Sequence, residues 1–253
     1  MAASRRTRNR RTRRILLATI LIGMLVGFGI WSRGQFSQAG GEPEPSISPR
    51  VLFEQRCEEI RRSGGDTLQI TDFAVDDEMV KSIAGLDSLV TVIFDQGAVS
   101  DQAIETIAGL PNLQHLRLRL SPIGDAGMKR IATMESLWYL NLPQAECTAE
   151  GVAELAALPR LRQLRLGSRN LGNEVTHAIE QIESLRGIHL IGIGVTDEGL
   201  RRLAGMQHLE SLYLDDSAVT EAGWEWLFDR HPHLHVHVNQ MHHDRDPKAH
   251  EHH

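Results

Sequence analysis

The histidines near the C-terminus are the residues of this chain whose type and spacing best suit metal binding. Nine of the thirteen histidines lie between His231 and His253. His235 and His237 alternate with two valines, a pattern typical of a strand whose imidazoles share one face. Neutral imidazole binds zinc and copper, and the carboxylate of Asp215 would join the set if it lay on the preceding strand. His235, His237 and Asp215 are therefore candidate metal ligands.

Two other interpretations of these histidines remain open. A polar tail would bind divalent metals weakly without a defined site, through His242, His243, His250, His252 and His253. The histidines can also be incidental, with Val236 and Val238 anchoring a closing strand that needs no metal. We favour these alternatives, so the prediction is no resident cofactor or metal.

A second group of polar and aromatic side chains recurs at alternating positions, which is where the outward face of a sheet is expected. Arg and Tyr are frequent anchors of protein interfaces. This pattern indicates a binding face for a protein, a peptide or a polysaccharide. The candidates are His115, Arg117, Arg119, Tyr139, Asn141, Arg165, His189 and Tyr213. The competing interpretation is a solvated strand face on which each arginine pairs with a neighbouring acid.

Motifs of common enzymes are missing from the sequence. It contains no G-x-S-x-G, no glycine-rich phosphate loop, no H-E-x-x-H and no C-x-x-C. The paired aspartates fit turns better than acid–base catalysis. We predict that the chain is not an enzyme.

Seven segments of equal length, from Gly65 to Pro232, must position all of these side chains. They align without gaps when the chain is cut after every 24th residue, and we number the columns of this frame from 1 to 24. Column 1 is leucine in six segments, and columns 4 and 6 are apolar in all seven; the residues of column 6 are Ile70, Phe94, Leu118, Leu142, Leu166, Leu190 and Leu214. The pattern L-x-x-L-x-L at a fixed period resembles the leucine-rich repeat family.

The resemblance implies an α/β solenoid with a right-handed coil. Each repeat would give one strand of a parallel concave sheet and one helix on the convex face. Column 12 supplies expected N-caps (Ser100, Thr148, Thr196, Thr220), and column 13 supplies acids near the helix dipole (Asp77, Asp101, Asp125, Asp197, Glu221). Column 9 lacks the asparagine that the family often has, so we expect no asparagine ladder. Glu180 replaces an alanine in the segment 161–184, whose convex side should be the least regular.

The part of the sequence before Pro49 suggests export. Seven arginines in residues 1–14, a basic cytoplasmic segment, precede the uncharged residues 15–31, which are near the shortest length for a transmembrane signal anchor. A single-pass protein with extracytoplasmic repeats is the first interpretation, and export with signal-peptide cleavage near Ala39 is the alternative. Residues 32–48 would form a flexible linker, and Ser48 and Pro49 would start a capping helix over 49–64. The repeat domain is placed at 65–240 and a His-rich disordered tail at 241–253.

Charge and cysteine content limit the remaining function classes. Of 27 Lys and Arg, seven precede Trp31 and no acid does, so the rest carries 20 bases against 33 acids, a net charge of −13. Such an acidic domain repels phosphates, and we predict no nucleic-acid partner. Cys57 and Cys147 are expected to be buried free thiols. The prediction is a monomeric, membrane-anchored binding module, with a structural envelope protein or a metal-binding exported protein as alternatives.

Overall fold

The structure of the protein is a computed structural model, and it describes residues 47–242. The predicted basic segment, signal anchor and most of the linker lie outside these residues, as does the tail from residue 243 onward. Within the described residues, no helix combines the length and apolar character that crossing a membrane requires.

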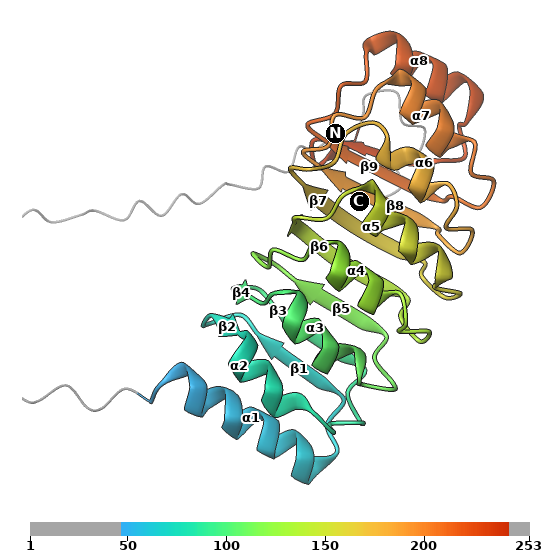
Figure 1. The fold of residues 1–253 in the computed structure, drawn as a ribbon. Helices are drawn as coiled ribbons and strands as arrows, with labels where there is room; N and C mark the ends of the chain where they lie inside the picture. Colours follow the sequence, from blue (N-terminus) through green and yellow to red (C-terminus); the bar gives the residue numbers. More distant parts are fainter. Residues whose placement is uncertain (1–46, 243–253) are drawn as a thin grey trace, which may run out of the picture. The chain divides into compact units, whose positions relative to one another are not determined.

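One sheet organises the described residues (Figure 1). Eight of its nine strands are parallel, and the last is antiparallel to its neighbour. In chain order and in sheet order they are β1 (Thr67–Ile70), β3 (Thr91–Phe94), β5 (His115–Leu118), β6 (Tyr139–Ala145), β7 (Gln163–Ser168), β8 (Gly187–Ile191), β9 (Ser211–Asp215), β10 (His235–Val238) and β11 (Met241–His242). Each parallel strand pairs with the next at a spacing of one repeat, as Leu116 does with Leu140 and Leu140 with Leu164. The register of the sheet is therefore the repeat frame of the sequence.

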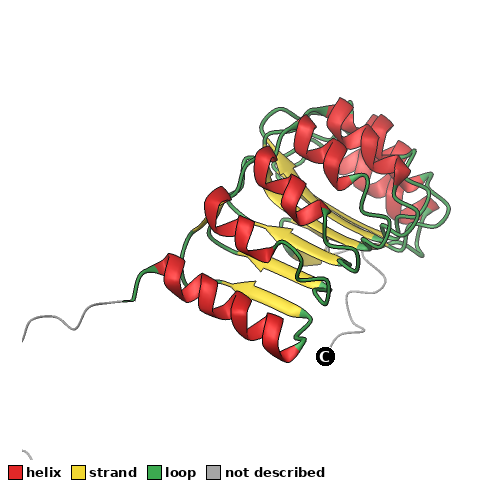
Figure 2. Ribbon diagram, turned by 60° about the horizontal axis from the view of Figure 1, so that its bottom comes forward, coloured by secondary structure: helices red, strands yellow, loops and turns green. Residues whose placement is uncertain are grey.

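The helices lie along one side of the sheet (Figure 2). They are α1 (Pro49–Ser63), α2 (Asp77–Val80), α3 (Asp101–Ala108), α4 (Asp125–Ile131), α5 (Ala149–Glu154), α6 (Val175–Ile179), α7 (Asp197–Ala204) and α8 (Glu221–Arg230). Short 3-10 turns extend α2 (Lys81–Ile83) and α5 (Leu155–Ala157), and a two-stranded pair, β2 (Val75–Asp76) and β4 (Gly97–Ala98), joins two loops. Among the six regular repeats, which are those with leucine in column 1, α6 is the shortest helix, and this confirms the irregularity expected for the segment 161–184.

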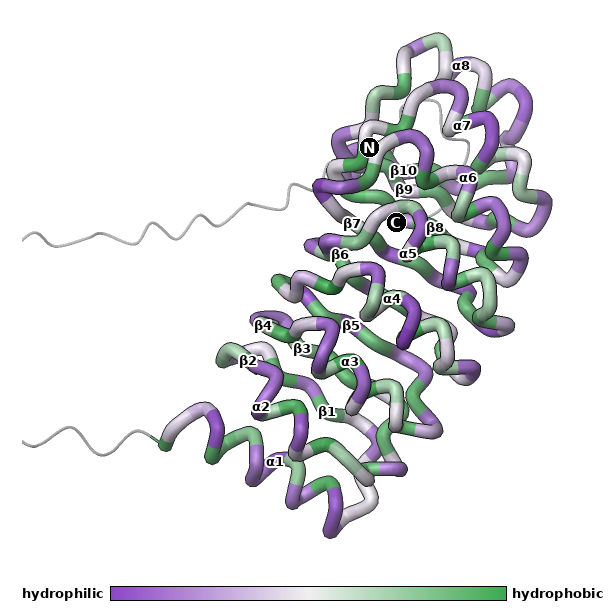
Figure 3. The backbone as a smooth tube through the Cα atoms, in the orientation of Figure 1, coloured by the Kyte–Doolittle hydropathy of each residue, from purple (hydrophilic) through white to green (hydrophobic). Residues whose placement is uncertain are grey.

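The core lies between the sheet and the helices. Columns 4 and 6 are fully or almost fully buried in every repeat, as Leu116, Leu118 and Phe94 illustrate. Figure 3 shows the same alternation as apolar positions that recur along the coil. Burying each such side chain contributes about 1.5–3 kcal/mol, and neighbouring repeats share these contacts. The fold is a leucine-rich repeat solenoid, as the sequence indicated.

The cysteines belong to this core. Cys57 and Cys147 are both buried and both free, as predicted. Burial raises the pKa of the Cys57 thiol to about 11 and that of Cys147 to about 12. Both are therefore protonated and packed as small apolar side chains.

Helix α1 closes the N-terminal end of the sheet. The hydroxyl of Ser48 accepts a hydrogen bond from the backbone N–H of Val51, and Gly64 ends the helix in the left-handed conformation. Phe53 is fully buried and its ring lies 5.9 Å from that of Phe94. An apolar helix face thus covers what would otherwise be an open edge of the first repeat.

A ladder of column-13 side chains links the loops where each helix begins. Asp125 accepts hydrogen bonds from the backbone N–H of Thr148 at 2.7 Å and from its hydroxyl at 2.9 Å. Asp197 binds Thr220 in the same way, at 2.8 and 2.7 Å. Asp77, Asp101 and Asn173 make the equivalent bonds to the next repeat. We call this set the Asp ladder, and it takes the place of the asparagine ladder that column 9 lacks.

The Asp ladder corrects the capping role expected for column 12. The hydroxyls of Thr148 and Thr196 do not cap their own helices, and both donate to the preceding repeat. Ser100 and Thr220 do cap their helices and also donate to the ladder. A hydroxyl can donate one bond and accept another, so the two roles are compatible.

The ladder explains two further details of the repeat. A Cβ atom added at Gly199 would lie 2.2 Å from Asn173 Oδ1. A Cβ atom at Gly127, Gly151 or Gly223 would be equally close to the carboxylate of a ladder aspartate. Ala149 occupies column 13 of its repeat and has no side-chain acceptor, so one rung of the ladder is missing. The N–H of Gly172, which would bind that rung, donates instead to Glu174 of its own repeat at 2.7 Å. The missing rung precedes α6, the shortest helix of the regular repeats.

The C-terminal end differs from its prediction. β10 pairs with β9 as expected, and Val236 is fully buried. It is not the closing strand, because the chain turns at Asn239 and Gln240 and pairs again through β11. Met241 and His242 therefore do not belong to a disordered tail, and the repeat domain extends beyond the predicted boundary at 240. The turn allows β11 to pair with backbone N–H and C=O groups of β10 that would otherwise face solvent.

Candidate functional site

The helices leave one face of the sheet uncovered, and we call it the concave face (Figure 2). Columns 3, 5 and 7 form this face, because they alternate with the buried columns 4 and 6. The strand register places His115 beside Tyr139, Asn141 beside Arg165, and His189 beside Tyr213. The same register puts Arg117 next to Asn141. The structure therefore brings the predicted face residues together as one continuous surface.

An aromatic cluster occupies the start of β5 and β6. The ring centroids of His115 and Tyr139 lie 4.1 Å apart, and the ring of Trp138 lies 5.8 Å from that of Tyr139. Trp138 is 40% exposed. Trp138 is not among the residues predicted for this face, because its column precedes the alternating strand positions. Burial, with a contribution from Arg117, lowers the pKa of His115, which favours the neutral form of this ring.

Arg117 and Arg165 have different surroundings on this face. Arg117 forms an ion pair with Asp95, in which Nε lies 2.9 Å from Oδ1 and Nη2 donates to Oδ2 at 3.1 Å. The side chain of Arg165 forms no ion pair within residues 47–242. The interpretation that each arginine pairs with a neighbouring acid is therefore correct for Arg117 and wrong for Arg165. Arg119 is exposed at the rim of the face.

Asn141 and Arg165 are the polar centre of the concave face. Asn141 is only 3% exposed and its Nδ2 donates to the Tyr139 hydroxyl at 3.2 Å. Its Oδ1 is buried without a hydrogen-bond partner in the described structure, and so is Nε of the adjacent Arg165. A buried polar atom left without a partner costs about 1–3 kcal/mol. Such atoms are uncommon in folded proteins and favour a binding role.

His189 and Asp215 form a second polar element, nearer the C-terminus. His189 Nε2 lies 2.8 Å from Asp215 Oδ2. Burial lowers the pKa of His189 and outweighs the opposing effect of Asp215. A His–Asp pair can orient a catalytic base, but among the described residues no serine or cysteine side chain hydrogen-bonds to His189. The pair borders a hollow of about 190 Å³ lined by His189, Tyr213, Asp215, His237 and Gln240.

Asp215 is not placed as a metal ligand of His235 and His237. Its Oδ2 faces His189, and its Oδ1 accepts a hydrogen bond from the backbone N–H of Gln240 at 3.0 Å. The histidine that joins His235 and His237 is His242, from β11. His242 was predicted to lie in the tail, because an Asn-Gln pair does not indicate a hairpin as an Asn-Gly pair does.

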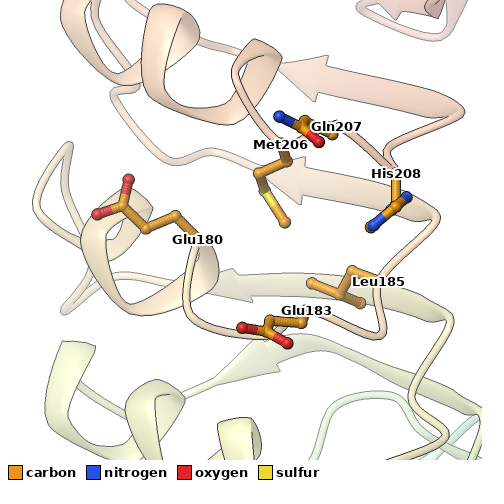
Figure 4. A pocket seen from close by; sticks show the side chains of 6 residues that line it. All are labelled: Glu180, Glu183, Leu185, Met206, Gln207 and His208. Carbon is orange, nitrogen blue, oxygen red and sulfur yellow. The ribbon is translucent and has the colours of Figure 1, made fainter.

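A larger hollow, of about 370 Å³, lies away from the concave face, between the loops that lead into β8 and β9 (Figure 4). Its lining mixes acids with apolar and polar groups: Glu180, Glu183, Leu185, Met206, Gln207 and His208. None of the predicted site residues lies there.

No protein family model and no curated protein sequence matches the chain. Similar solved structures include an internalin from Listeria monocytogenes, with 16% identity, a TM-score of 0.46 and coverage of 61% of this chain and 48% of that one. Another is a leucine-rich repeat protein from Leptospira interrogans, with 17% identity, a TM-score of 0.45 and coverage of 68% and 54%. The chain thus spans about half the length of each. The repeat register and the parallel sheet show the leucine-rich repeat fold without reference to these structures.

Proposed function

We propose that the protein is a non-enzymatic binding module whose concave face holds an extended segment of a partner protein. In this proposal, residues 15–31 anchor the chain in a membrane as a monomer, and the repeats face the extracytoplasmic side. The arginine-rich start and the uncharged segment of the sequence support the anchor. The geometry of the concave face supports the ligand class.

The observation that carries the proposal is the pair of unsatisfied atoms at the centre of the face. Asn141 Oδ1 is an acceptor and Arg165 Nε is a donor, and they lie on neighbouring strands in register. A peptide backbone offers both complementary groups, an N–H and a C=O. Binding would therefore satisfy two buried atoms that the free protein leaves unpaired, which favours the bound state.

The surroundings of this pair add contact area and charge. The cluster of His115, Trp138 and Tyr139 lies on the N-terminal side and offers aromatic rings for apolar side chains of the ligand. Arg119 is exposed nearby and Arg165 has no acid as partner in the described structure, so the centre favours a ligand with a carboxylate. A polysaccharide is a less suitable ligand because it supplies no such negative charge unless it is acidic.

Crosslinking in the native envelope followed by purification tests the binding face. A double variant, Tyr139→Ala with Arg165→Met, should lose a partner protein that the wild type captures. The matched control is Arg169→Ala, because this arginine is exposed and pairs with Glu146 outside the strand columns of the face. Equal capture by the wild type and the double variant would instead favour a structural envelope protein without a specific ligand.

Protease treatment of intact spheroplasts tests the topology separately. The repeats should be degraded while the arginine-rich start stays protected. Full protection of the repeats would contradict the anchored, extracytoplasmic arrangement. If no protected fragment is found, the result would favour the alternative, signal-peptide cleavage near Ala39.

A further inference from the structure

Three histidines from the last two strands meet on the concave face, and their position is independent of the proposed peptide site. Each of His235, His237 and His242 offers one ring nitrogen such that all three nitrogens lie within 4.8 Å of one another. The ring centroids of His237 and His242 are 4.1 Å apart, and those of His235 and His237 are 4.8 Å apart. All three side chains are half-buried.

The backbone of the β10–β11 hairpin creates this arrangement. His237 and His242 are cross-strand partners, and Val238 pairs with Met241, which leaves a two-residue turn. Both turn residues, Asn239 and Gln240, have positive φ angles of 52° and 64°. Such angles match a type I′ hairpin, in which asparagine is tolerated, whereas at Gln240 they cost about 1–2 kcal/mol.

Side chains of the turn and of the preceding strand hold the strained backbone in place. Asp215 Oδ1 accepts a bond from the N–H of Gln240 at 3.0 Å, and Asn239 Oδ1 accepts one from the N–H of Asp216 at 2.8 Å. Strain that neighbouring groups maintain is typical of functional sites. Here its consequence is that His242 lies across from His237 rather than pointing along the chain.

The donor set matches a transition-metal site. Three imidazoles with an open fourth position form a common zinc centre, and imidazole also suits copper and nickel. Nitrogens bound to one zinc ion at about 2.0–2.1 Å lie roughly 3.3 Å from each other in tetrahedral geometry. The three rings therefore need to approach by about 1.5 Å at most, which side-chain rotation on a hairpin can provide.

We propose that His235, His237 and His242 bind one divalent transition-metal ion, with zinc as the representative ion. His237 also lines the hollow of about 190 Å³ next to Tyr213, so water or a donor atom of a ligand has room beside the site to take the fourth position. The site is distinct from chelation by the histidines beyond residue 242. It also replaces the predicted ligand Asp215, whose oxygens hold His189 and the turn.

Zinc titration of the full chain by calorimetry tests the site. One variant carries His237→Gln and His242→Gln, and the matched control carries His243→Gln, His250→Gln, His252→Gln and His253→Gln. The control should keep one tight equivalent of zinc. The site variant should bind that equivalent about 100-fold more weakly or lose it, since even an outer-shell partner contributes 10–100-fold. A tight equivalent that survives in the site variant, or is missing from the wild type, overturns the proposal.

A second measurement covers the case in which the site variant fails to fold. Nitrogen NMR of the wild-type imidazoles, recorded with and without zinc, needs no substitution at the site. The first equivalent should move the ring resonances of His235, His237 and His242 together. Changes confined to histidines beyond residue 242 contradict the site.

Discussion

The Asp ladder and the concave face use polar side chains in opposite ways. In the ladder, Asp125 and Asp197 each accept two hydrogen bonds from the next repeat, and a glycine leaves them room. On the concave face, Asn141 Oδ1 and Arg165 Nε are buried without partners in the described structure. The ladder connects repeats to one another, while the face leaves groups ready for another molecule.

This difference separates stability from function within one repeat. A satisfied network stabilises each junction between repeats, and its loss should be measurable as unfolding free energy. An unsatisfied buried pair costs free energy in the isolated protein, so its removal should leave stability unchanged or higher. Substitutions that break the ladder should therefore lower the stability, while removal of the unsatisfied pair should leave it near the wild-type value or raise it.

The largest effect is expected from Gly199→Ala. The new Cβ would lie 2.2 Å from Asn173 Oδ1 and 3.0 Å from Thr176 Cγ2, so a ladder rung must break or shift. Crowding of this kind costs about 1–3 kcal/mol, and the helix preference of alanine returns up to about 1 kcal/mol. We expect a net loss of about 2 kcal/mol in urea denaturation. Gly194→Ala is the control, because no atom lies within 4 Å of its added Cβ; equal effects would refute the role of the ladder.

Asp125→Ala should have the next largest effect. It removes the acceptor of both the Thr148 N–H and the Thr148 hydroxyl. Since the site is partly exposed, water replaces some of this loss, and we expect about 1–2 kcal/mol of destabilisation. Glu135→Ala, an exposed acid outside the ladder, should change the unfolding free energy by less than about 0.5 kcal/mol. Partner capture should be the same for both variants.

Arg165→Met should behave in the reverse manner. Methionine keeps most of the apolar stem of arginine and removes the buried Nε that lacks a partner in the described structure. We expect a stability within about 1 kcal/mol of wild type, or above it, together with loss of the crosslinked partner. A loss of stability as large as that of Gly199→Ala would show that Arg165 is structural, and the contrast between the two regions would fail.

The repeat fold was predictable because every repeat carries the same information. Column 6 is apolar in all seven repeats, so its inward position needs no long-range knowledge, and the sheet register follows the repeat spacing. The outward positions of Arg117, Asn141 and Arg165 follow from the same alternation. Their different pairing could not be predicted, because it depends on whether an acid such as Asp95 lies within reach on the adjacent strand.

Features that occur once or join two repeats were harder to predict. Thr148 has the sequence of an N-cap, but its hydroxyl bonds the carboxylate of Asp125 in the preceding repeat. The turn of the β10–β11 hairpin consists of Asn239 and Gln240. Its conformation is stabilised by hydrogen bonds to the carboxylate of Asp215, at the end of β9, and to the backbone N–H of Asp216, which follows β9. The conformational preferences of the local sequence predict neither the Thr148–Asp125 bond nor the bonds to the turn, because each joins residues of different repeats. The ladder did leave one signal in the sequence, since the column-13 acids Asp101, Asp125 and Asp197 are each followed by a glycine 26 residues later, in column 15 of the next repeat.

The smallest expected effect concerns the charge of the ladder and its pH dependence. The N–H and hydroxyl of Thr220 lower the pKa of Asp197 below its usual value. A lowered pKa in the folded state contributes stability above the unfolded pKa of about 3.9, and this contribution disappears as the pH falls through the folded value.

Asp197→Asn should keep the geometry, because Asn173 already serves as a neutral rung. The stability difference between wild type and Asp197→Asn, from urea denaturation, should thus be constant near pH 7 and shrink below about pH 4. Asn173→Asp should add a similar pH dependence, and a difference for Asp197→Asn that does not vary with pH would show that the rungs act through geometry alone.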